Sequence, residues 1–186
     1  ESRPDILIVS NAPGELAAWV RPVLARLQEE LPEARVVVAL VPCPYASGRE
    51  ADTLRAWGHV GDVWSPGATL RALITGRHPD GQGRAERGVV LFLGGDQVFA
   101  AGLANRFRYP LLVYTDGAAR WRRQVHRYLV GDRNTFLRLR NRRHPADGLR
   151  LVGNLMVDAV QTHYDPIQTR RALGLRPDAP VGGLLP

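Results

Sequence analysis

The chain has 186 residues, of which 45% are hydrophobic and 23% are charged, a balance typical of one globular domain. A single cysteine, Cys43, excludes a disulfide-framed secreted module, and no apolar run reaches the ~18–20 residues of a membrane span. The net charge is +7, from 25 basic residues, all arginine, against 18 acids. The first residues lack the pattern of a signal peptide, so we expect a cytoplasmic protein.

The predicted elements alternate between short apolar runs and stretches with helical periodicity. The predicted strands, in chain order, are 5–10, 35–41, 60–64, 89–93, 111–115, 127–130, 149–152 and 181–185. The predicted helices are 16–31, with a kink or restart at Pro22, then 50–57, 68–74, 97–107, 135–142, 155–164 and 167–173. The glycine-rich segment 76–88 is predicted to be a surface loop or disordered.

Most of the predicted strands are apolar throughout, which is typical of strands buried on both faces of a sheet. Alternation of such strands with helices predicts an α/β fold, with a Rossmann-like parallel sheet and helices on both of its faces. Ligands in this architecture bind at the carboxyl ends of the strands. The loops that matter are therefore 11–15, 94–97 and 115–121.

The positive charge is concentrated in segment 120–143, which has nine arginines and one acid, Asp132. The rest of the chain has 16 arginines and 17 acids and is nearly neutral. Such a segment is typical of a solvated basic face, a nucleic-acid patch, or a docking site for anionic lipid or phosphate.

The loop after the first strand contains Asn11, Gly14 and Glu15 and leads directly into a helix. Gly14 permits a tight turn, and the free N–H groups at the helix start suit an anion. No Gly-x-Gly-x-x-Gly or Gly-Lys-Ser/Thr motif is present, which excludes a dinucleotide fingerprint or a P-loop. Glu15 either belongs to a substrate loop or only favours the helix dipole.

Asp96 follows the Gly94-Gly95 pair at the end of the predicted strand 89–93, the most apolar one. Its carboxylate is placed either to cap the following helix or to act as a general base, and Gly95 allows close approach of a ligand. Trp121 stands among arginines, so it stacks on a base or sugar, lies at a membrane interface, or packs in the core with the arginines on the outer face of a helix. The isolated histidines, such as His126 and His144, predict no metal site.

Several motifs occur in an order that resembles the N-terminal half of the lipid-A-disaccharide synthase family, which are GT-B-type glycosyltransferases. The resemblance covers nearly the whole chain and rests on loose motifs in a moderately specific order. These motifs are Phe92-Leu93-Gly94-Gly95-Asp96, Leu112-Val113-Tyr114, Arg120-Trp121-Arg122-Arg123-Gln124, Leu151-Val152-Gly153-Asn154-Leu155-Met156-Val157-Asp158, Leu173-Gly174-Leu175 and Gly183-Leu184-Leu185-Pro186.

The resemblance implies roles for individual residues. Asp96 falls on the presumed catalytic base of the family. The residues that fall on the acceptor cleft, or on the stretch leading toward the second domain, are Asn11, Gly14, Glu15, Gly95, Tyr114, Trp121, Gly153, Asn154 and Asp158. The chain departs from the family pattern at Pro13-Gly14-Glu15, along 115–121 and at Asn154. The resemblance therefore indicates the reaction class, and it does not identify the acceptor.

The resemblance also implies the domain organisation. Residues 1–186 would form a single acceptor-side domain, in which 165–186 enter a C-terminal domain that holds the donor. The expected activity is hexosyl transfer from a nucleotide-sugar, UDP-linked in the usual case, to a lipid-linked or phosphorylated sugar, with no metal or other cofactor.

Two alternatives stay open beside this expectation. One is a UDP-sugar epimerase or hydrolase of the same fold, and the other is a non-catalytic binder of anionic surfaces. We expect no nucleic-acid partner. An anionic membrane is the expected contact of segment 120–143, which would place the protein at the inner face of the plasma membrane.

Overall fold

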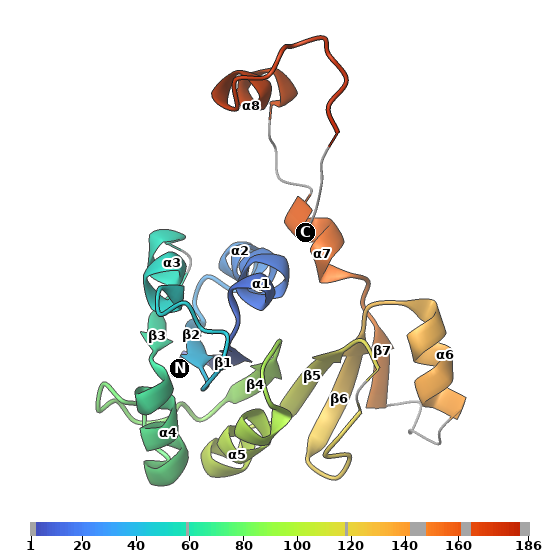
Figure 1. Cartoon of the computed structure of the whole chain (residues 1–186). Coiled ribbons are helices and arrows are strands. Elements are labelled where there is room, and N and C mark those ends of the chain that lie inside the picture. Colours follow the sequence, from blue (N-terminus) through green and yellow to red (C-terminus); the bar gives the residue numbers. More distant parts are fainter. Residues whose placement is uncertain (1–2, 59, 118, 142–147, 161–164, 183–186) are drawn as a thin grey trace.

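The computed structural model describes residues 3–58, 60–117, 119–141, 148–160 and 165–182. Seven strands, all paired in parallel, form one sheet in the order β3-β2-β1-β4-β5-β6-β7 (Figure 1). The strands are β1 (Asp5–Ser10), β2 (Arg35–Leu40), β3 (Asp62–Trp64), β4 (Gly88–Phe92), β5 (Leu111–Thr115), β6 (Val125–Val130) and β7 (Leu149–Leu151).

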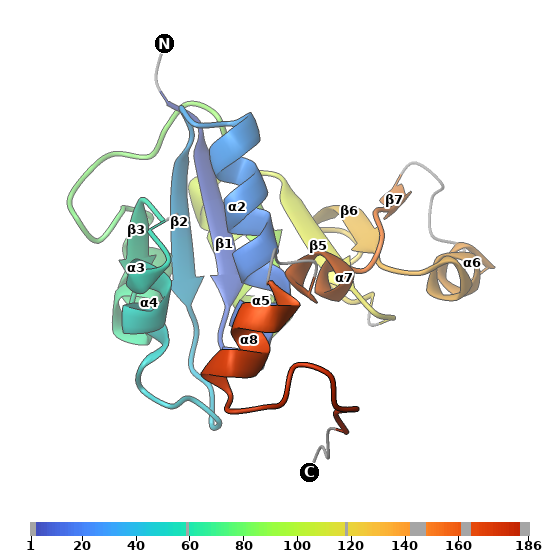
Figure 2. The same ribbon diagram turned by 90° about the horizontal axis from the view of Figure 1, so that it is seen from above.

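Helices connect most of the strands and pack against the sheet (Figure 2). The helices are α1 (Pro13–Glu15), α2 (Arg21–Glu30), α3 (Glu50–Ala56), α4 (Pro66–Thr75), α5 (Gln97–Phe107), α6 (Arg133–Asn141), α7 (Leu155–Val160) and α8 (Pro166–Ala172). A π-helical turn, Leu16–Val20, joins α1 to α2, so that Pro22 lies in the first turn of α2, where proline is tolerated.

Two apolar clusters lie on opposite faces of the sheet. On one face, Leu24 of α2 and Leu54 of α3 pack with inward-facing residues of β1 to β3. On the other face, α4, α5 and α6 pack over the sheet, with Phe107 and Leu139 among their buried residues. The α/β fold with flanking helices is therefore confirmed, and its cause is the apolar character of the strands on both sides.

The direction of chain progression reverses between β1 and β4. From β1 the chain moves through β2 to β3 at one edge, and from β4 it moves through β5 and β6 to β7 at the other. The loops that leave β1 and β4 therefore diverge, and a crevice opens between the carboxyl ends of these strands.

The predicted boundaries differ from the structure in a few places. Strand β6 begins earlier than predicted, because a bulge pairs Leu111 with Val125 and Leu112 with Arg127 and leaves His126 as an extra residue. Val181 and Gly182 are not in a strand, and the remainder of the predicted strand 181–185 lies outside the described residues. The ends of the helices predicted at 135–142 and 155–164 also lie outside them.

The segment 76–88 is the predicted surface loop, because most of its residues are exposed and only Gly88 belongs to a helix or strand. It is anchored at two points, because the His78 side chain and Ala85 are both buried. His78 lies edge-on against the rings of Trp64 and Phe107. The loop thereby closes over the amino-terminal edge of the sheet.

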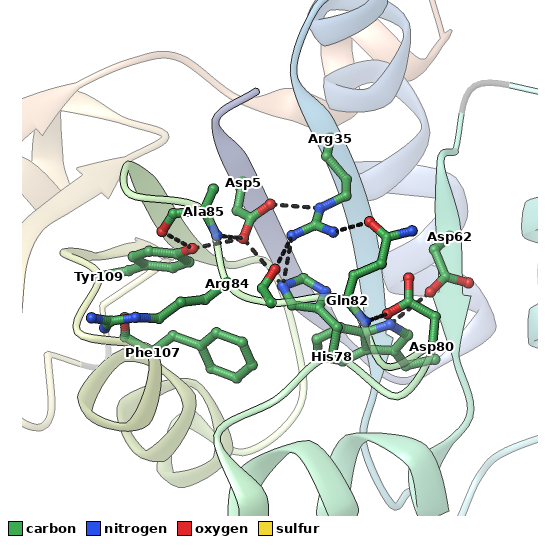
Figure 3. A network of polar contacts seen from close by, with 12 residues as sticks. Asp5, Arg35, Asp62, His78, Asp80, Gln82, Arg84, Ala85, Phe107 and Tyr109 are labelled. Atoms are coloured by element: carbon green, nitrogen blue, oxygen red, sulfur yellow. Dashed lines mark hydrogen bonds and ion pairs between the residues drawn. The ribbon is translucent and has the colours of Figure 1, made fainter. Parts of the chain in front are cut away.

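Asp5, the first residue of β1, is the centre of a buried polar network at this edge (Figure 3). Its side chain is 0% exposed and accepts hydrogen bonds from Arg35 Nε (2.7 Å), the Ala85 amide (3.0 Å) and the Tyr109 hydroxyl (2.6 Å). The Nε2 atom of His78 lies 3.1 Å from the same carboxylate.

These bonds determine the charge state of Asp5. Burial by itself raises the pKa of the Asp5 carboxyl, but the hydrogen bonds from His78, Arg35, the Ala85 amide and Tyr109 outweigh burial and hold the pKa well below its usual range. Burial and the neighbouring Asp5 also raise the pKa of the Tyr109 hydroxyl, which stays protonated as the donor. Asp5 is therefore a structural anion.

Among the described residues, no helix is both long enough and apolar enough to cross a membrane.

Candidate functional site

Four loops meet above the carboxyl ends of the central strands. They follow β1, β2, β4 and β5, which are neighbours in the sheet although they are not consecutive in the chain. This is the place where the strand order reverses, and α/β sheets bind ligands there. Two adjoining pockets occupy it.

The first, which we call the Asp96 pocket, has a volume of about 410 Å³ and is open to solvent. Residues from all four loops line it: Asn11, Pro42, Pro44, Gly95, Asp96, Gln97 and Arg120. The pocket therefore brings a carboxylate, a guanidinium and two carboxamide residues to one cavity.

Asp96 caps the following helix, which is one of the two roles that its sequence position allows. Its Oδ1 atom accepts a hydrogen bond from the Val98 amide at 3.0 Å and caps the N-terminus of α5. The side chain is nevertheless exposed, and within the described part of the chain its other oxygen has no hydrogen-bond partner. One oxygen is thus fixed and the other is open to a ligand.

Arg120 lines the same pocket as Asp96, and a hydrogen bond to its main chain fixes its position. The hydroxyl of Tyr128, on β6, donates a hydrogen bond to the Arg120 carbonyl. Burial raises the pKa of Tyr128 to about 12, so the hydroxyl remains a donor. The Arg120 side chain itself is exposed, which leaves its guanidinium available to an anion.

The second, which we call the Glu15 pocket, has a volume of about 250 Å³ and adjoins the first through Gly95 and Gln97. Its lining is Glu15, Trp19, Phe92, Gly94, Gly95, Gln97, Tyr114, Thr115 and Asp116. Aromatic rings and carboxylates together are suited to a sugar, whose ring carries apolar C–H faces and hydroxyl groups.

Glu15 connects the first loop to the Gly94-Gly95 pair. Its carboxylate oxygens lie 3.4 Å from the amides of Ala12 and Gly95. Gly94 permits this approach, because a Cβ atom there would lie 2.0 Å from Glu15 Oε2. Gly95 has φ +87°, a left-handed conformation that favours glycine, and a Cβ there would lie 2.7 Å from Val41 Cγ2.

We expect Gly94→Ala to displace the Glu15 carboxylate and to lower the free energy of unfolding by about 1 kcal/mol, the value of the hydrogen bonds lost. Urea denaturation measures this change. Glu15→Ala removes the same contacts. The free energy of unfolding of the double variant should therefore fall no further than that of the more destabilised single variant. Additive losses would contradict the contact. Gly83→Ala is the control, since a Cβ at Gly83 meets nothing within 4 Å.

Tyr114 contributes to the site mainly through its ring. It is only 8% exposed, and its ring packs edge-on against Trp19 with the centroids 5.7 Å apart. Its hydroxyl donates to the Gly153 carbonyl and accepts from the Leu155 amide at 3.3 Å. Tyr114 therefore lines the Glu15 pocket and also ties β5 to the start of α7.

Several residues predicted for the site lie elsewhere. Gly14 is exposed and lines neither pocket. Asn154 is exposed, and its Oδ1 accepts from the Met156 amide at 3.0 Å at the start of α7. Trp121 is 41% exposed with φ +58°, in the loop before β6, so the alternative of a core tryptophan on a helix is wrong. Asp158 is exposed on α7.

The sequence interpretation missed other lining residues. From the sequence, Pro42 and Pro44 mark only the end of a strand, and Trp19 belongs only to an apolar helix face. The available signal was topological, because the loop after β2 must emerge beside β1. Gln97 is the first residue of α5 and lines both pockets.

The arginines of segment 120–143 that the structure describes have different surroundings. Arg120 lines the Asp96 pocket, Arg127 lies on an open face of the sheet, and Arg138 donates to the Asp116 carbonyl. The exposed guanidinium groups that contact no pocket belong to Arg122, Arg123, Arg133 and Arg140. Arg142 and Arg143 lie outside the described residues.

Within the described residues, no three His, Cys, Asp or Glu side chains gather as metal ligands. The geometry defines a fold class: a Rossmann-like α/β domain, resembling a GT-B or epimerase domain, with two pockets at the reversal of strand order.

Comparison with known proteins agrees with this class at the level of fold. No family model and no curated protein matches the sequence. Among solved structures, a UDP-N-acetylglucosamine 2-epimerase is similar, with a TM-score of 0.60 and 12% identity over 91% of this chain. The chain covers 53% of the length of that structure.

Proposed function

We propose that this chain is the acceptor-side domain of a hexosyltransferase, which moves a sugar from a UDP-sugar to a hydroxyl of a lipid-linked or phosphorylated sugar. The observation that carries the proposal is the open oxygen of Asp96 in a pocket at the reversal of strand order. A carboxylate fixed through one oxygen keeps the other in position to accept a proton.

In the proposed reaction, Asp96 is the general base. Asp96 accepts the proton of the acceptor hydroxyl, and the oxygen attacks the anomeric carbon of the donor. The bond from that carbon to the phosphate oxygen breaks, and UDP leaves with the electron pair. Attack from the opposite side inverts the anomeric configuration. The protonated Asp96 returns its proton to solvent.

Arg120 supports an acceptor that carries a phosphate. Its guanidinium lines the same pocket as Asp96 and is suited to a phosphate through two parallel hydrogen bonds. The Glu15 pocket beside it would hold a sugar ring against Trp19 and Tyr114. In this arrangement Asn11 and Gly95 complete the wall between the acceptor and the sheet.

We further propose that a second, C-terminal domain holds the donor, and that residues 165–186 lead toward it. The chain covers only 53% of the similar epimerase structure, which supports a longer protein. The order of motifs supports a divergent relative of lipid-A-disaccharide synthase. The exposed arginines of segment 120–143 would attract the anionic membrane that carries a lipid-linked acceptor, each contributing about 1 kcal/mol.

A UDP-sugar epimerase or hydrolase is the second candidate, because the similar structure is a UDP-N-acetylglucosamine 2-epimerase. The two candidates differ in their need for an acceptor. An epimerase or hydrolase converts the UDP-sugar alone, whereas a transferase requires a second sugar.

Product analysis distinguishes the two candidates. The whole protein that contains this domain is incubated with UDP-N-acetylglucosamine, with and without a sugar phosphate, and the products are followed by proton and phosphorus NMR. We expect UDP and a new glycosidic signal only with the acceptor. Turnover of the UDP-sugar alone indicates the epimerase or hydrolase. No turnover in either mixture contradicts catalysis and leaves non-catalytic binding to an anionic surface.

A further inference from the structure

One face of the sheet is only partly covered by the described helices. On the side where α2 and α3 cover β1 to β3, α7 lies beside α2 and contacts β5 where the Leu155 amide bonds to Tyr114, near the carboxyl end of the strand (Figure 1). The helices that pack on β4, β5 and β6 from the opposite side are α5 and α6. Parallel sheets occur almost only with both faces covered.

The residues on this face are apolar but incompletely buried. On the covered side, Leu111, Val113 and Val130 are 0% exposed. On the open side, the alternate residues of the same strands are only half-buried, and these are Val89, Leu91, Leu112 and Leu129. Central strands normally bury both sets, so the open side has the composition of an interface.

The open side contains a groove of about 460 Å³. Its floor is Val89, Pro110, Leu112 and Leu129, and its lining continues to Leu151 and Val152, which are 50% and 49% exposed. The groove lies on the face of the sheet, separate from the two pockets at the carboxyl ends of the strands, because it shares no lining residue with them.

Three basic side chains complete the lining: His126, Arg127 and Arg150. Arg127 pairs in register with Leu112, and Arg150 with Leu129, so both arginines flank the apolar floor. The bulge in β6 adds His126 to the same rim. Within the described part of the chain, neither guanidinium forms an ion pair.

We propose that this groove binds an amphipathic α-helix whose apolar stripe is flanked by carboxylates. A helix is the element that covers the face of a parallel sheet, and acidic flanks complement Arg127 and Arg150. The six residues of β6 span about 20 Å at ~3.3 Å per residue. A helix of that length has about 13 residues at ~1.5 Å rise.

A peptide pair tests the proposal. One synthetic peptide of about 14 residues has leucines at helical spacing and glutamates beside them, and its partner has lysine at each glutamate position. Calorimetry should show binding of the glutamate peptide at least about tenfold tighter than that of the lysine peptide. A third peptide with the same composition and a scrambled stripe should not bind. Equal affinity for the first two peptides, or binding of the scrambled one, would overturn the proposal.

Charge reversal localises the interaction. The double variant Arg127→Glu with Arg150→Glu should invert the preference, so that the lysine peptide binds more tightly. The matched control is Arg133→Glu with Arg140→Glu, on the exposed side of α6, which should keep the original preference. Circular dichroism checks that both variants fold. An unchanged preference in the first variant would contradict the assignment. Self-association of the wild-type protein that Arg127→Glu with Arg150→Glu abolishes would also contradict the assignment, because a second copy of the chain would then occupy this face.

Discussion

Asp5→Ala is expected to lower the free energy of unfolding by about 3–5 kcal/mol, which is the usual cost of removing one member of a buried ion pair. The substitution leaves Arg35, the Ala85 amide and the Tyr109 hydroxyl without their shared acceptor. A domain of this size is stable by about 5–15 kcal/mol, so the loss is a large fraction of the total. Urea denaturation measures it.

The matched control is the same substitution at an exposed position. Asp52 pairs with Arg55 on α3, and its side chain is 82% exposed. Asp52→Ala should therefore change the free energy of unfolding by less than about 1 kcal/mol. A similar loss in both variants would show that burial of the Asp5 network contributes nothing specific.

The contribution of Asp5 should also depend on pH. The unfolded carboxyl has its ordinary pKa of about 3.9, and the folded one has a lower pKa. The stabilisation is therefore complete above the unfolded pKa, declines as the pH falls below it, and is lost once the pH has passed the folded pKa. The difference between the wild type and Asp5→Ala should shrink from pH 6 to pH 3, and a constant difference would contradict the shifted pKa.

Asp96→Asn is expected to reduce turnover of the whole enzyme by about 10²–10⁴-fold, the usual contribution of a general base. Asparagine keeps the oxygen that accepts from the Val98 amide, and it is as good an N-cap as aspartate. The substitution therefore removes the base and retains the cap. Steady-state kinetics with UDP-sugar and acceptor measures the effect, and turnover within a few-fold of the wild type would exclude the base role.

A second capping aspartate supplies the control. Asp165 caps α8, where its Oδ1 accepts from the Ile167 amide at 2.9 Å, and it lines neither pocket. Asp165→Asn makes the same chemical change at a cap without a proposed reaction. It should leave turnover unchanged, and thermal unfolding of both variants should stay near that of the wild type.

The fold was predictable because each strand carries its own signal. A run such as 36–40 is apolar throughout, and that is a local property of the chain. The loops that follow such runs could also be chosen from sequence, since parallel strands end at a common edge. This reasoning led to Asp96, Asn11 and Glu15, which do line the pockets.

The structural features that the sequence does not predict depend on contacts between distant parts of the chain. Asp5 reads as the polar start of a strand, and its partners Arg35, His78 and Tyr109 are 30, 73 and 104 residues away. The buried position of Tyr114 depends on Trp19 and on the backbone of α7, which no local pattern indicates. The location of Trp121 outside both pockets depends on a loop conformation with positive φ.

The two ends of the sheet have separate tasks. The ion pair and hydrogen bonds of Asp5 stabilise the amino-terminal edge of the sheet, whereas both pockets open at its carboxyl-terminal edge. Engineering for heat tolerance can therefore be directed at the first edge, and redesign of ligand choice at the second. Changes at the two edges are far enough apart for their free energies to add, so a stabilised scaffold would tolerate extensive exchange of the loops around Asp96.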